Sequence, residues 1–564
     1  MGTYELSNET HELIRQARMV GGIPPDRYQV PFRSIAELLD RRAAETPEKP
    51  FLIYWNDERD ERVGFTYAAF NRRVNQAANF LRNELGAMRG ERIATVAYNH
   101  SDTVLVYFAC WKLGCTVAPQ NVSEDDSRIA FILQNAGCRV ALVRLEYRER
   151  VEALKAQVPG LTQVVLLDQN DFTARVDLQS EEFEPPDEMM LEDEALLVYT
   201  SGTTGAPKGV QLTQYNMLAD AKGICDWQQV TADQRWMCIL PIHHVNGTIV
   251  TLVTPMYIGG SVVLNRGFKA SLFWRRISDE QVHIVSLVPT ILQFLNEAGR
   301  RPAEYAVDQL RYVICGAGTL AVAVAKRFEE TFGVRVLHGY GLSETTCYSC
   351  FLPVDLPMEE HRRWLEAYGY PSIGVPINVN EMAIHDADGR PMPDGERGEI
   401  VIRGHNVMAG YFQRPDANAE TFRHGWFRSG DEGFVQRDAA GRPFFFISGR
   451  IKELINRGGV KYSPFEIEEV LLEIPGVKVG LAVAFPNTWY GEEVGAYIVA
   501  RDEATVDEAM VLAHCRRRMP FAKCPKVVVF GTEVPVTTTG KYQRLRLQEL
   551  FSTWADTQFR QERA

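Results

Sequence analysis

The segment from Thr200 to Gly209 combines residue types that bind phosphate groups. It reads Thr-Ser-Gly-Thr-Thr-Gly-Ala-Pro-Lys-Gly and directly follows the apolar run Ala195–Tyr199. Glycines let backbone N–H groups approach a phosphate closely, hydroxyls add donors and Lys208 adds a mobile cation. The spacing differs from a Walker A loop, which places four residues between its first Gly and its Gly-Lys-Ser/Thr. A polar surface loop is the plainer alternative, but this composition after a strand favours phosphate binding.

A second segment, from Gly339 to Thr345, places a carboxylate beside an aromatic turn. It reads Gly-Tyr-Gly-Leu-Ser-Glu-Thr and follows a predicted strand at Val334–Leu337. Two glycines around Tyr340 permit a tight turn that presents the ring as a flat wall. Phosphates repel a carboxylate such as Glu344 unless a cation intervenes, so Mg²⁺ is its natural partner at such a site. A glutamate that caps a helix is the alternative interpretation.

Four further segments are weaker signals when each is taken alone. They are Cys315-Gly316-Ala317-Gly318 at a strand end, Ser429-Gly430-Asp431, the Pro-Ile-His-His-Val-Asn-Gly segment at 241–247, and the segment 535–544 with Thr539-Gly540-Lys541. A Gly-rich strand end, an acidic turn, a structural histidine and a solvated lysine are the ordinary interpretations of such segments. Their order along the chain is what gives them weight.

In this order, the segments resemble those of the AMP-forming acyl- and aryl-CoA synthetases, adenylate-forming enzymes whose superfamily includes luciferases and adenylation domains. The resemblance covers residues 32–547. It implies that Tyr340 stacks near adenine, that Thr345 contacts the α-phosphate and that Glu344 orients Mg²⁺. It also implies that Asp431 accepts the ribose hydroxyls. The implied ATP- or AMP-binding residues are Thr200, Ser201, Gly202, Thr203, Thr204, Gly205, Lys208, Gly316, Ala317, Gly318, Gly339, Tyr340, Gly341, Thr345, Asp431 and Arg450.

The same resemblance assigns the remaining site residues. Lys541 matches the family's catalytic lysine, and Lys541, Glu344 and His244 are the implied catalytic residues. His244 matches the residue that gates the acyl pocket, and His243 is left as a wall or structural residue. Lys452 matches the hinge about which the small domain rotates. The implied acyl pocket is His244, Asn246, Gly247, Gly318 and Gly341, with Gly316 and Tyr340 beside it, and the implied CoA tunnel is Gly458 and Gly459.

The resemblance implies a two-step ligase. A carboxylic acid and ATP give an acyl-adenylate and pyrophosphate, and coenzyme A then displaces AMP; ATP, Mg²⁺ and coenzyme A are the expected cofactors and co-substrates. Small residues in the implied pocket favour a medium or bulky apolar acid. Three alternatives stay open: transfer to a separate carrier protein, a luciferase-like oxygenase, and a non-catalytic paralogue. The last is disfavoured because Lys541, Glu344 and Asp431 are all present.

The elements that must position these segments alternate between apolar strands and helices. Predicted strands are Arg92–Ala97, Arg139–Leu142, Gln163–Leu167, Leu196–Thr200, Ser261–Leu264, Ile284–Leu287 and Tyr312–Cys315, and predicted helices include Tyr67–Leu85 and Ala321–Thr331. Such alternation predicts parallel sheets covered by helices on both faces. Ligands bind beyond the carboxyl ends of strands in such sheets, which is where several of the Gly-rich segments fall.

The pattern changes after about residue 370. Strands at Glu399–Arg403 and Pro443–Ile447 predict a β-rich subdomain, and a shorter unit with helices at Pro464–Glu473 and Val506–Met519 follows. The expected fold is therefore α/β: a large N-terminal domain, residues 1–448, of parallel sheets flanked by helices plus a β-rich subdomain, then a small α+β C-terminal domain, residues 449–564, which the resemblance implies to be mobile.

Composition limits the class of protein. The chain has 564 residues, a formal net charge of −12 and 45% hydrophobic residues, which predicts several packed domains and argues against a nucleic-acid-binding surface. No basic start precedes an apolar run, and no apolar run is long enough to cross a bilayer, so a soluble cytoplasmic protein is expected. The ten cysteines are scattered, which is typical of reduced thiols. A homodimer is left open.

Overall fold

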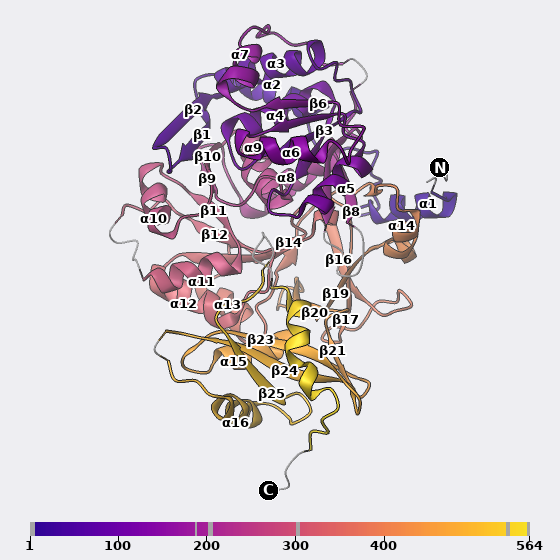
Figure 1. The fold of residues 1–564 in the computed structure, drawn as a ribbon, viewed down its shortest axis with the longest axis vertical. Helices are drawn as coiled ribbons and strands as arrows, with labels where there is room; N and C mark the ends of the chain where they lie inside the picture. The colour runs from indigo at the N-terminus through magenta and orange to yellow at the C-terminus, as the bar shows by residue number, and fades with distance from the viewer. Residues whose placement is uncertain are drawn as a thin grey trace.

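The chain forms a large body and a small C-terminal unit (Figure 1). The structure is a computed structural model, and it describes residues 6–186, 189–200, 207–299, 305–502, 504–536 and 542–560. Two sheets with their helices make up most of the large body, and a β-rich region lies beside the small unit. The predicted fold class is thereby confirmed, while the mobility of the small unit stays a prediction.

The first sheet has seven strands in the order β18-β8-β7-β4-β3-β5-β6. Strands β3 to β7 pair in parallel, and β8 and β18 add an antiparallel edge. The parallel strands are largely buried because helices cover both faces of the sheet. The bounds are β3 Arg92–Val96, β4 Thr116–Gln120, β5 Val140–Val143, β6 Gln163–Leu166, β7 Glu194–Thr200, β8 Lys208–Thr213 and β18 Gly410–Tyr411.

The second sheet has nine strands in the order β15-β14-β13-β12-β11-β9-β10-β1-β2. Its six central strands are parallel, whereas β2, β14 and β15 pair antiparallel at the two ends. The bounds are β1 Pro50–Asn56, β2 Glu61–Thr66, β9 Arg235–Cys238, β10 Ser261–Asn265, β11 Ile284–Leu287, β12 Tyr312–Cys315, β13 Arg335–Tyr340, β14 Cys350–Phe351 and β15 Val375–Pro376.

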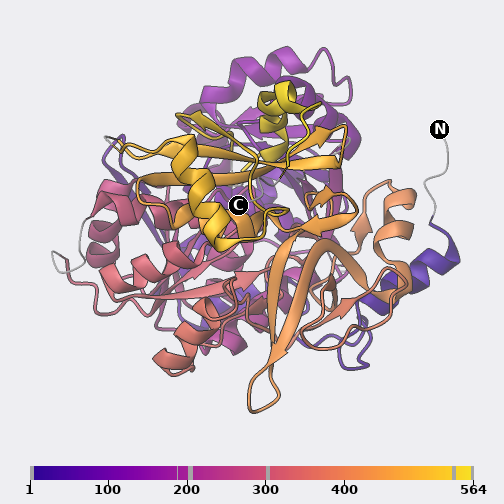
Figure 2. The same cartoon turned by 90° about the horizontal axis from the view of Figure 1, so that it is seen from below.

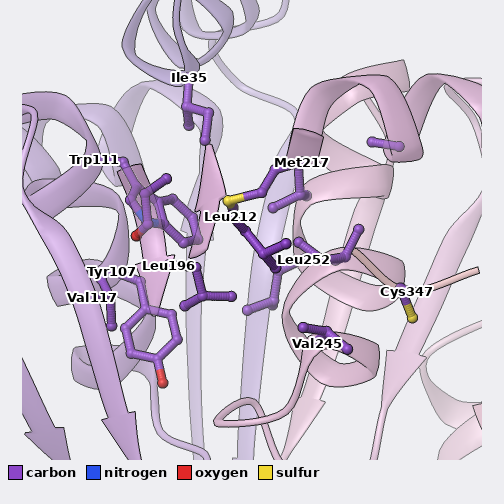
Figure 3. Packing of buried hydrophobic residues seen from close by; sticks show 14 of the residues in the cluster. Ile35, Tyr107, Trp111, Val117, Leu196, Leu212, Met217, Val245, Leu252 and Cys347 are labelled. Atoms are coloured by element: carbon purple, nitrogen blue, oxygen red, sulfur yellow. The ribbon is translucent and has the colours of Figure 1, made fainter. Parts of the chain in front are cut away.

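Helices pack between and around these two sheets. Every residue of α4 except Asp102 is buried, and Trp111 on this helix donates its indole N–H to the Ala195 carbonyl of β7 at 2.8 Å. Figure 3 shows Trp111 in this core with Leu196 and Leu252 from neighbouring elements. The bounds are α1 Asn8–Ala17, α2 Ile35–Glu45, α3 Tyr67–Asn83, α4 Ser101–Leu113, α5 Asp126–Ala136, α6 Arg148–Leu154, α7 Ala174–Val176, α8 Gln214–Gln228, the π-helical η3 Asn246–Val253, α9 Thr254–Ile258, α10 Ala270–Asp279, α11 Pro289–Ala298, α12 Val322–Phe332, α13 Met358–Glu366 and α14 Pro415–Thr421.

A four-stranded antiparallel sheet leads into the small unit. Its strands are β16 Asn380–His385, β17 Gly398–Gly404, β19 Phe427–Arg437 and β20 Pro443–Arg450. The small unit holds β21 Ile455–Arg457, β22 Val460–Tyr462, α15 Pro464–Leu472, β23 Val477–Asn487, β24 Gly491–Ala500, α16 Glu508–Arg518 and β25 Val527–Gly531, and Figure 2 shows its sheet from below. Strand β20 ends at Arg450, so the chain leaves this sheet just before Lys452.

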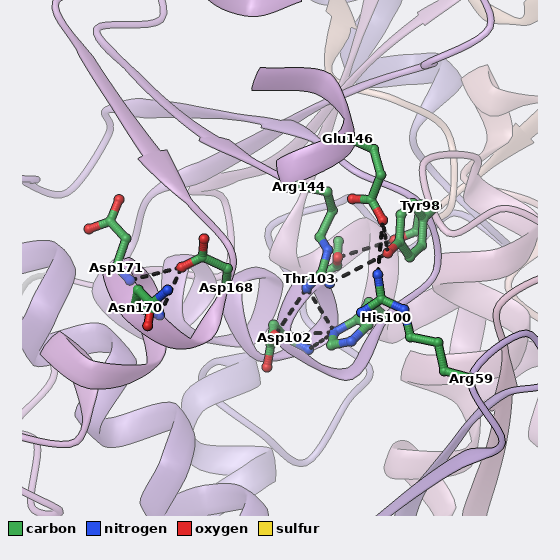
Figure 4. A network of polar contacts seen from close by, with 10 residues as sticks. All are labelled: Arg59, Tyr98, His100, Asp102, Thr103, Arg144, Glu146, Asp168, Asn170 and Asp171. Carbon is green, nitrogen blue, oxygen red and sulfur yellow. Dashed lines mark hydrogen bonds and ion pairs between the residues drawn. The ribbon is translucent and has the colours of Figure 1, made fainter. Parts of the chain in front are cut away.

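A polar cluster caps the carboxyl ends of β3 and β5 (Figure 4). Arg144 bonds to Asp102 at 3.1 Å, and the Tyr98 hydroxyl donates to Glu146 at 2.8 Å. The cluster ties the start of α4 to the chain that leaves β5. Its side chains bond to one another and therefore serve the packing of this sheet edge.

The described residues bear on two further expectations. None of their helices combines the length and the apolar character that crossing a bilayer requires. All ten cysteines fall within the described residues, and each is a buried free thiol. Burial raises the pKa of Cys347 and Cys350 well above the usual thiol value, so both stay protonated at neutral pH.

Candidate active site

Tyr340, Asp431 and Arg450 form one buried corner. Tyr340 ends β13, and its hydroxyl donates to the Asp431 carboxylate at 2.5 Å. Asp431 lies opposite Arg450 across β19 and β20, and the Arg450 Nε is 2.9 Å from the Asp431 carboxylate. Asp431 is only 1% exposed, so this carboxylate is held in one orientation by a phenol and a guanidinium. Three residues that the sequence predicts for adenine and ribose are therefore brought together.

A cavity of about 380 Å³ separates this corner from the small unit. Gly318, Gly341, Tyr340, Asp431 and Arg450 line its large-body side, and Glu469 and Tyr542 line the other side. Lys541 lies outside the described residues, but it directly precedes Tyr542. The pose of the small unit therefore brings the neighbour of the predicted catalytic lysine to the predicted nucleotide residues.

Lys208, Tyr411 and Glu344 form the predicted phosphate side. Thr200 ends β7 and pairs with Lys208 at the start of β8, while Ser201, Gly202, Thr203, Thr204 and Gly205 lie outside the described residues. The Lys208 ammonium lies 4.0 Å from the centre of the Tyr411 ring, and the Tyr411 hydroxyl donates to Glu344 at 2.8 Å. Burial lowers the pKa of Lys208, although the nearby Glu344 opposes that shift.

The chemistry of Glu344 suits a magnesium ion bound together with phosphates. The residue is 8% exposed, and its backbone carbonyl accepts the Met408 N–H at 2.9 Å. Mg²⁺ typically takes one or two protein carboxylates and fills its other positions with phosphate oxygens and water. The described part of the chain contains no group of three or more His, Cys, Asp or Glu side chains that could hold a metal by themselves. Glu344 therefore fits Mg²⁺ carried by a nucleotide.

Close backbone packing explains the glycines of the 339–345 segment. A Cβ on Gly341 would overlap the Cys347 carbonyl, and a Cβ on Gly339 would overlap the Phe351 ring. Thr345 is fully buried, and its hydroxyl bonds to the backbone of Leu342. No other residue than glycine fits at 339 and 341 without moving the chain.

Two residues near this segment hold left-handed backbone angles that cost energy outside glycine. Thr346 has φ 64° and ψ −55°, and the Cys347 N–H bonds to the Thr345 carbonyl at 2.7 Å, which is the geometry of a strained γ-turn. Ala317, in the Gly-Ala-Gly segment after β12, has φ 64°. Such strain persists only where the surrounding structure enforces it, and it is concentrated at functional sites.

Three of the predicted acyl residues, His244, Asn246 and Gly247, lie at the start of η3, whereas Gly318 and Gly341 line the cavity. His244 precedes this helix, and its ring centre is 4.4 Å from that of His243. Asn246 donates to the Tyr348 hydroxyl at 3.2 Å, and Gly247 packs so closely on Pro241 that a Cβ would lie 2.5 Å from the Pro241 carbonyl oxygen. Burial, with His244 as a smaller contribution, lowers the pKa of His243 well below 6.5, so this ring is neutral.

Gly316 does not open space in the acyl region. A Cβ at this position would lie 2.5 Å from the Tyr348 hydroxyl, so the tyrosine already occupies the volume that the missing side chain leaves. This weakens the expectation of a medium or bulky acid, because that expectation used Gly316 as evidence of room.

Contacts across the cavity hold the small unit against the large body. Glu469 on α15 accepts the Val322 N–H at the start of α12 at 2.9 Å, where Ala321 provides no side-chain cap. On the neighbouring α11, Glu297 forms an ion pair with Arg501 at 3.4 Å. These contacts define the present pose of the small unit.

The predicted CoA and hinge residues do not line the cavity themselves. Gly458 and Gly459 form the tip between β21 and β22, both at positive φ, and neither lines the cavity. Lys452 lies in the turn that follows β20, where the Glu453 and Leu454 N–H groups bond back to the Arg450 carbonyl. The glycine tip is therefore not brought together with Tyr340 and Asp431.

Sequence reasoning missed Tyr411, Tyr348 and Glu469. Tyr411 belongs to β18, which joins the first sheet from far along the chain. Tyr348 follows the 339–345 segment without a spacing that marks it. Glu469 lies on a helix predicted from its apolar face, and nothing local indicates that its carboxylate crosses to another unit. Each gains its role from tertiary contacts.

Comparisons with known proteins agree on one family. The AMP-binding enzyme model matches residues 39–412, and the model of the AMP-binding enzyme C-terminal domain matches residues 466–541. The chain is 34% identical to a sulfoacetate–CoA ligase from Cupriavidus necator over 92% of the chain and 97% of that protein, and 31% identical to an oxalate–CoA ligase from Arabidopsis thaliana over 91% and 97%. It superposes on the crystal structure of ATP-bound MatB from Rhodopseudomonas palustris with a TM-score of 0.82 and 26% identity, covering 92% of the chain and 99% of MatB.

Proposed function

Because this chain belongs to the AMP-binding enzyme family and is an acid–CoA ligase of that family, we propose that it acts through the residues of the cavity described above. The acid and ATP give an acyl-adenylate and pyrophosphate, and coenzyme A then gives the acyl-CoA and AMP. The observation that carries the assignment is the fixed corner of Tyr340, Asp431 and Arg450, which faces the cavity beside Tyr542.

In the first step a carboxylate attacks the α-phosphorus of ATP, so two anions must approach. Asp431 accepts the ribose hydroxyls, and the Tyr340 ring packs against adenine. Lys208 offers a cation to the phosphates, and Lys541 bridges the carboxylate and the α-phosphate. Glu344 would hold Mg²⁺, which would supply positive charge that offsets the phosphates. Catalysis then consists of positioning and charge stabilisation, with no general base.

In the second step a thiol displaces AMP. We assign the pose described here to the first step because Tyr542, and not the Gly458–Gly459 tip, lines the cavity. Rotation of residues 449–564 about Lys452 then removes Lys541 and brings the two glycines to the pantetheine arm, where small residues suit a narrow tunnel. The contact between Glu469 and Val322 must break in that rotation.

The acid and the acceptor are the finer parts of the proposal. Sulfoacetate and oxalate, the acids in the names of two relatives, are small and polar, whereas other relatives are named for feruloyl and long-chain fatty acyl groups, so the medium or bulky apolar acid stays a prediction. Their names as CoA ligases favour coenzyme A as acceptor, and neither a separate carrier protein nor a homodimer has support. An oxygenase likewise has none.

The test is acid-dependent AMP release from ATP, measured with and without coenzyme A across carboxylic acids of graded size and polarity. We expect stoichiometric AMP and acyl-CoA with at least one acid. Acid-dependent release of pyrophosphate that is the same with and without coenzyme A, with the acyl group left as adenylate and no acyl-CoA formed, would contradict the second step.

A further inference from the structure

Tyr348 closes one end of the region predicted to hold the acid. Its hydroxyl packs directly on Gly316, where an added Cβ would lie 2.5 Å away. The side chain is 2% exposed, and its ring centre lies 4.3 Å from that of Phe351. The space beside Gly316 that a long acyl chain would need is therefore filled by an aromatic ring.

The backbone around Tyr348 is fixed on both sides. The Asn406 amide donates to the Tyr348 carbonyl at 3.1 Å and to Asp220 at 3.2 Å, and the Tyr348 N–H donates to Asp220. Asp220 is fully buried, and this burial raises its pKa well above the usual range. The Thr346 hydroxyl donates to the Asn406 carbonyl at 2.6 Å. These bonds fix the backbone of Tyr348, while its ring is held by the packing against Phe351 and by the hydrogen bond that its hydroxyl accepts from Asn246.

The Tyr348 hydroxyl belongs to a cluster of buried polar groups. The Asn246 amide donates to the Tyr348 hydroxyl at 3.2 Å, and the Ser286 hydroxyl donates to the Asn246 carbonyl oxygen at 2.7 Å. Asn246 is 7% exposed and Ser286 is fully buried. They come from η3 and β11, so elements far apart in the sequence supply three polar groups to one place. Beyond these bonds, the Tyr348 hydroxyl can donate one hydrogen bond and the Asn246 amide one more, and an apolar chain packed against them would leave both donors without a partner, which is unfavourable.

We propose that the acid is short and carries a second hydrogen-bonding group, at the end remote from its carboxylate, which contacts the cluster of Asn246, Ser286 and Tyr348. This inference rests on the proposed function, and it replaces the medium or bulky apolar acid expected from the sequence. A site built from buried polar groups rejects a substrate that cannot pair with them far more strongly than an apolar pocket rejects a polar one.

The first experiment compares acids of matched size with the wild-type enzyme. CoA-dependent AMP release is measured with 3-hydroxypropionate against butyrate, which have equal numbers of heavy atoms, and with malonate, octanoate and benzoate. We expect kcat/KM for 3-hydroxypropionate or malonate to exceed that for butyrate by at least about tenfold, and octanoate and benzoate to be the poorest. Activity with octanoate or benzoate that equals or exceeds that of the polar acids overturns the inference and leaves the proposed function standing. Absence of release with every acid overturns both.

The second experiment removes the hydroxyl alone. Tyr348→Phe keeps the ring, so we expect the preference for 3-hydroxypropionate over butyrate to fall about tenfold. Tyr67→Phe is the matched control, because Tyr67 is also fully buried and its hydroxyl donates to the Gly260 carbonyl at 2.7 Å; its preference should not change. An unchanged preference in folded Tyr348→Phe overturns the inference. If that variant does not fold, Ser286→Ala provides the same comparison with the same expected fall.

Discussion

Asp431→Asn separates nucleotide binding from the binding of the acid. The substitution keeps the size of a side chain that is 1% exposed, and an amide oxygen can still accept the Tyr340 hydroxyl that now bonds at 2.5 Å. It removes the charge that faces Arg450 at 2.9 Å and, in the proposed function, the ribose hydroxyls. Because the Arg450 side chain is 38% exposed, water can solvate its unpaired charge, and we expect a loss of unfolding free energy of about 1 kcal/mol.

Asp431→Asn should change the binding of ATP more than it changes the free energy of unfolding. A hydrogen bond to a charged group contributes about 1.5–3 kcal/mol, which corresponds to about a ten- to hundredfold rise in the KM for ATP. The KM for the acid should stay within about twofold, since the acid binds on the other side of the adenylate. The assay is acid-dependent ATP–pyrophosphate exchange with each substrate varied in turn, supported by calorimetric titration with ATP.

A matched control lies in the same pair of strands. Asp438 bonds to the Arg442 Nε at 2.6 Å in the hairpin between β19 and β20, so Asp438→Asn removes a similar ion pair at the far end of the sheet. We expect its KM for ATP to equal that of the wild type. Equal increases in the two variants, or an unchanged KM in folded Asp431→Asn, would refute the ribose assignment.

Three further predictions concern catalysis, packing and pH. Lys541→Ala should lose most ATP–pyrophosphate exchange yet keep thioester formation from supplied acyl-adenylate. Lys452→Pro should keep the exchange and lose thioester formation, because proline fixes φ at the hinge. Equal losses in both assays for Lys541→Ala would contradict the rotation of the small domain between the two steps. Gly341→Ala should fail to fold or lose all activity, because its Cβ overlaps the Cys347 carbonyl. Circular dichroism and thermal unfolding test the folding, and ATP–pyrophosphate exchange tests the activity. Burial raises the pKa of Glu469 to about 7. The present pose of the small unit therefore binds a proton more tightly than a rotated pose that exposes Glu469. As pH rises toward about 7, the present pose loses stability relative to the rotated one. The ratio of exchange to thioester formation should therefore fall between about pH 5 and about pH 8, and Glu469→Gln should flatten that fall.

The parallel strands could be predicted because each depends on its own residues. The strands at Ile284–Leu287 and Tyr312–Cys315 occur with the predicted bounds, since short apolar runs between turn residues have few other uses in an α/β protein. The same local signals located Gly339 and Gly341, whose types follow from close contacts with the Phe351 ring and the Cys347 carbonyl.

What could not be predicted depends on residues that meet only in the folded chain. Strands β1 and β4 and helix α4 are almost wholly buried, so they carry no alternation or amphipathic stripe to mark them. Tyr348 fills the space beside Gly316 from a different element, and a glycine in a sequence does not reveal what packs against it. For that reason the sequence indicated room beside Gly316 at the place where the structure has the Tyr348 hydroxyl.

The pairing of β18 with β8 also affects how the chain must be made. Gly410 and Tyr411 complete the edge of a sheet whose neighbouring strand ends at Thr213. At a synthesis rate of about 5–20 residues per second, about 10–40 s separate the two strands on the ribosome. During that interval β8 presents an unpaired edge, which invites pairing with other chains. The phosphate side of the site therefore forms only late in translation, and the half-made protein depends on protection of that edge until Tyr411 arrives.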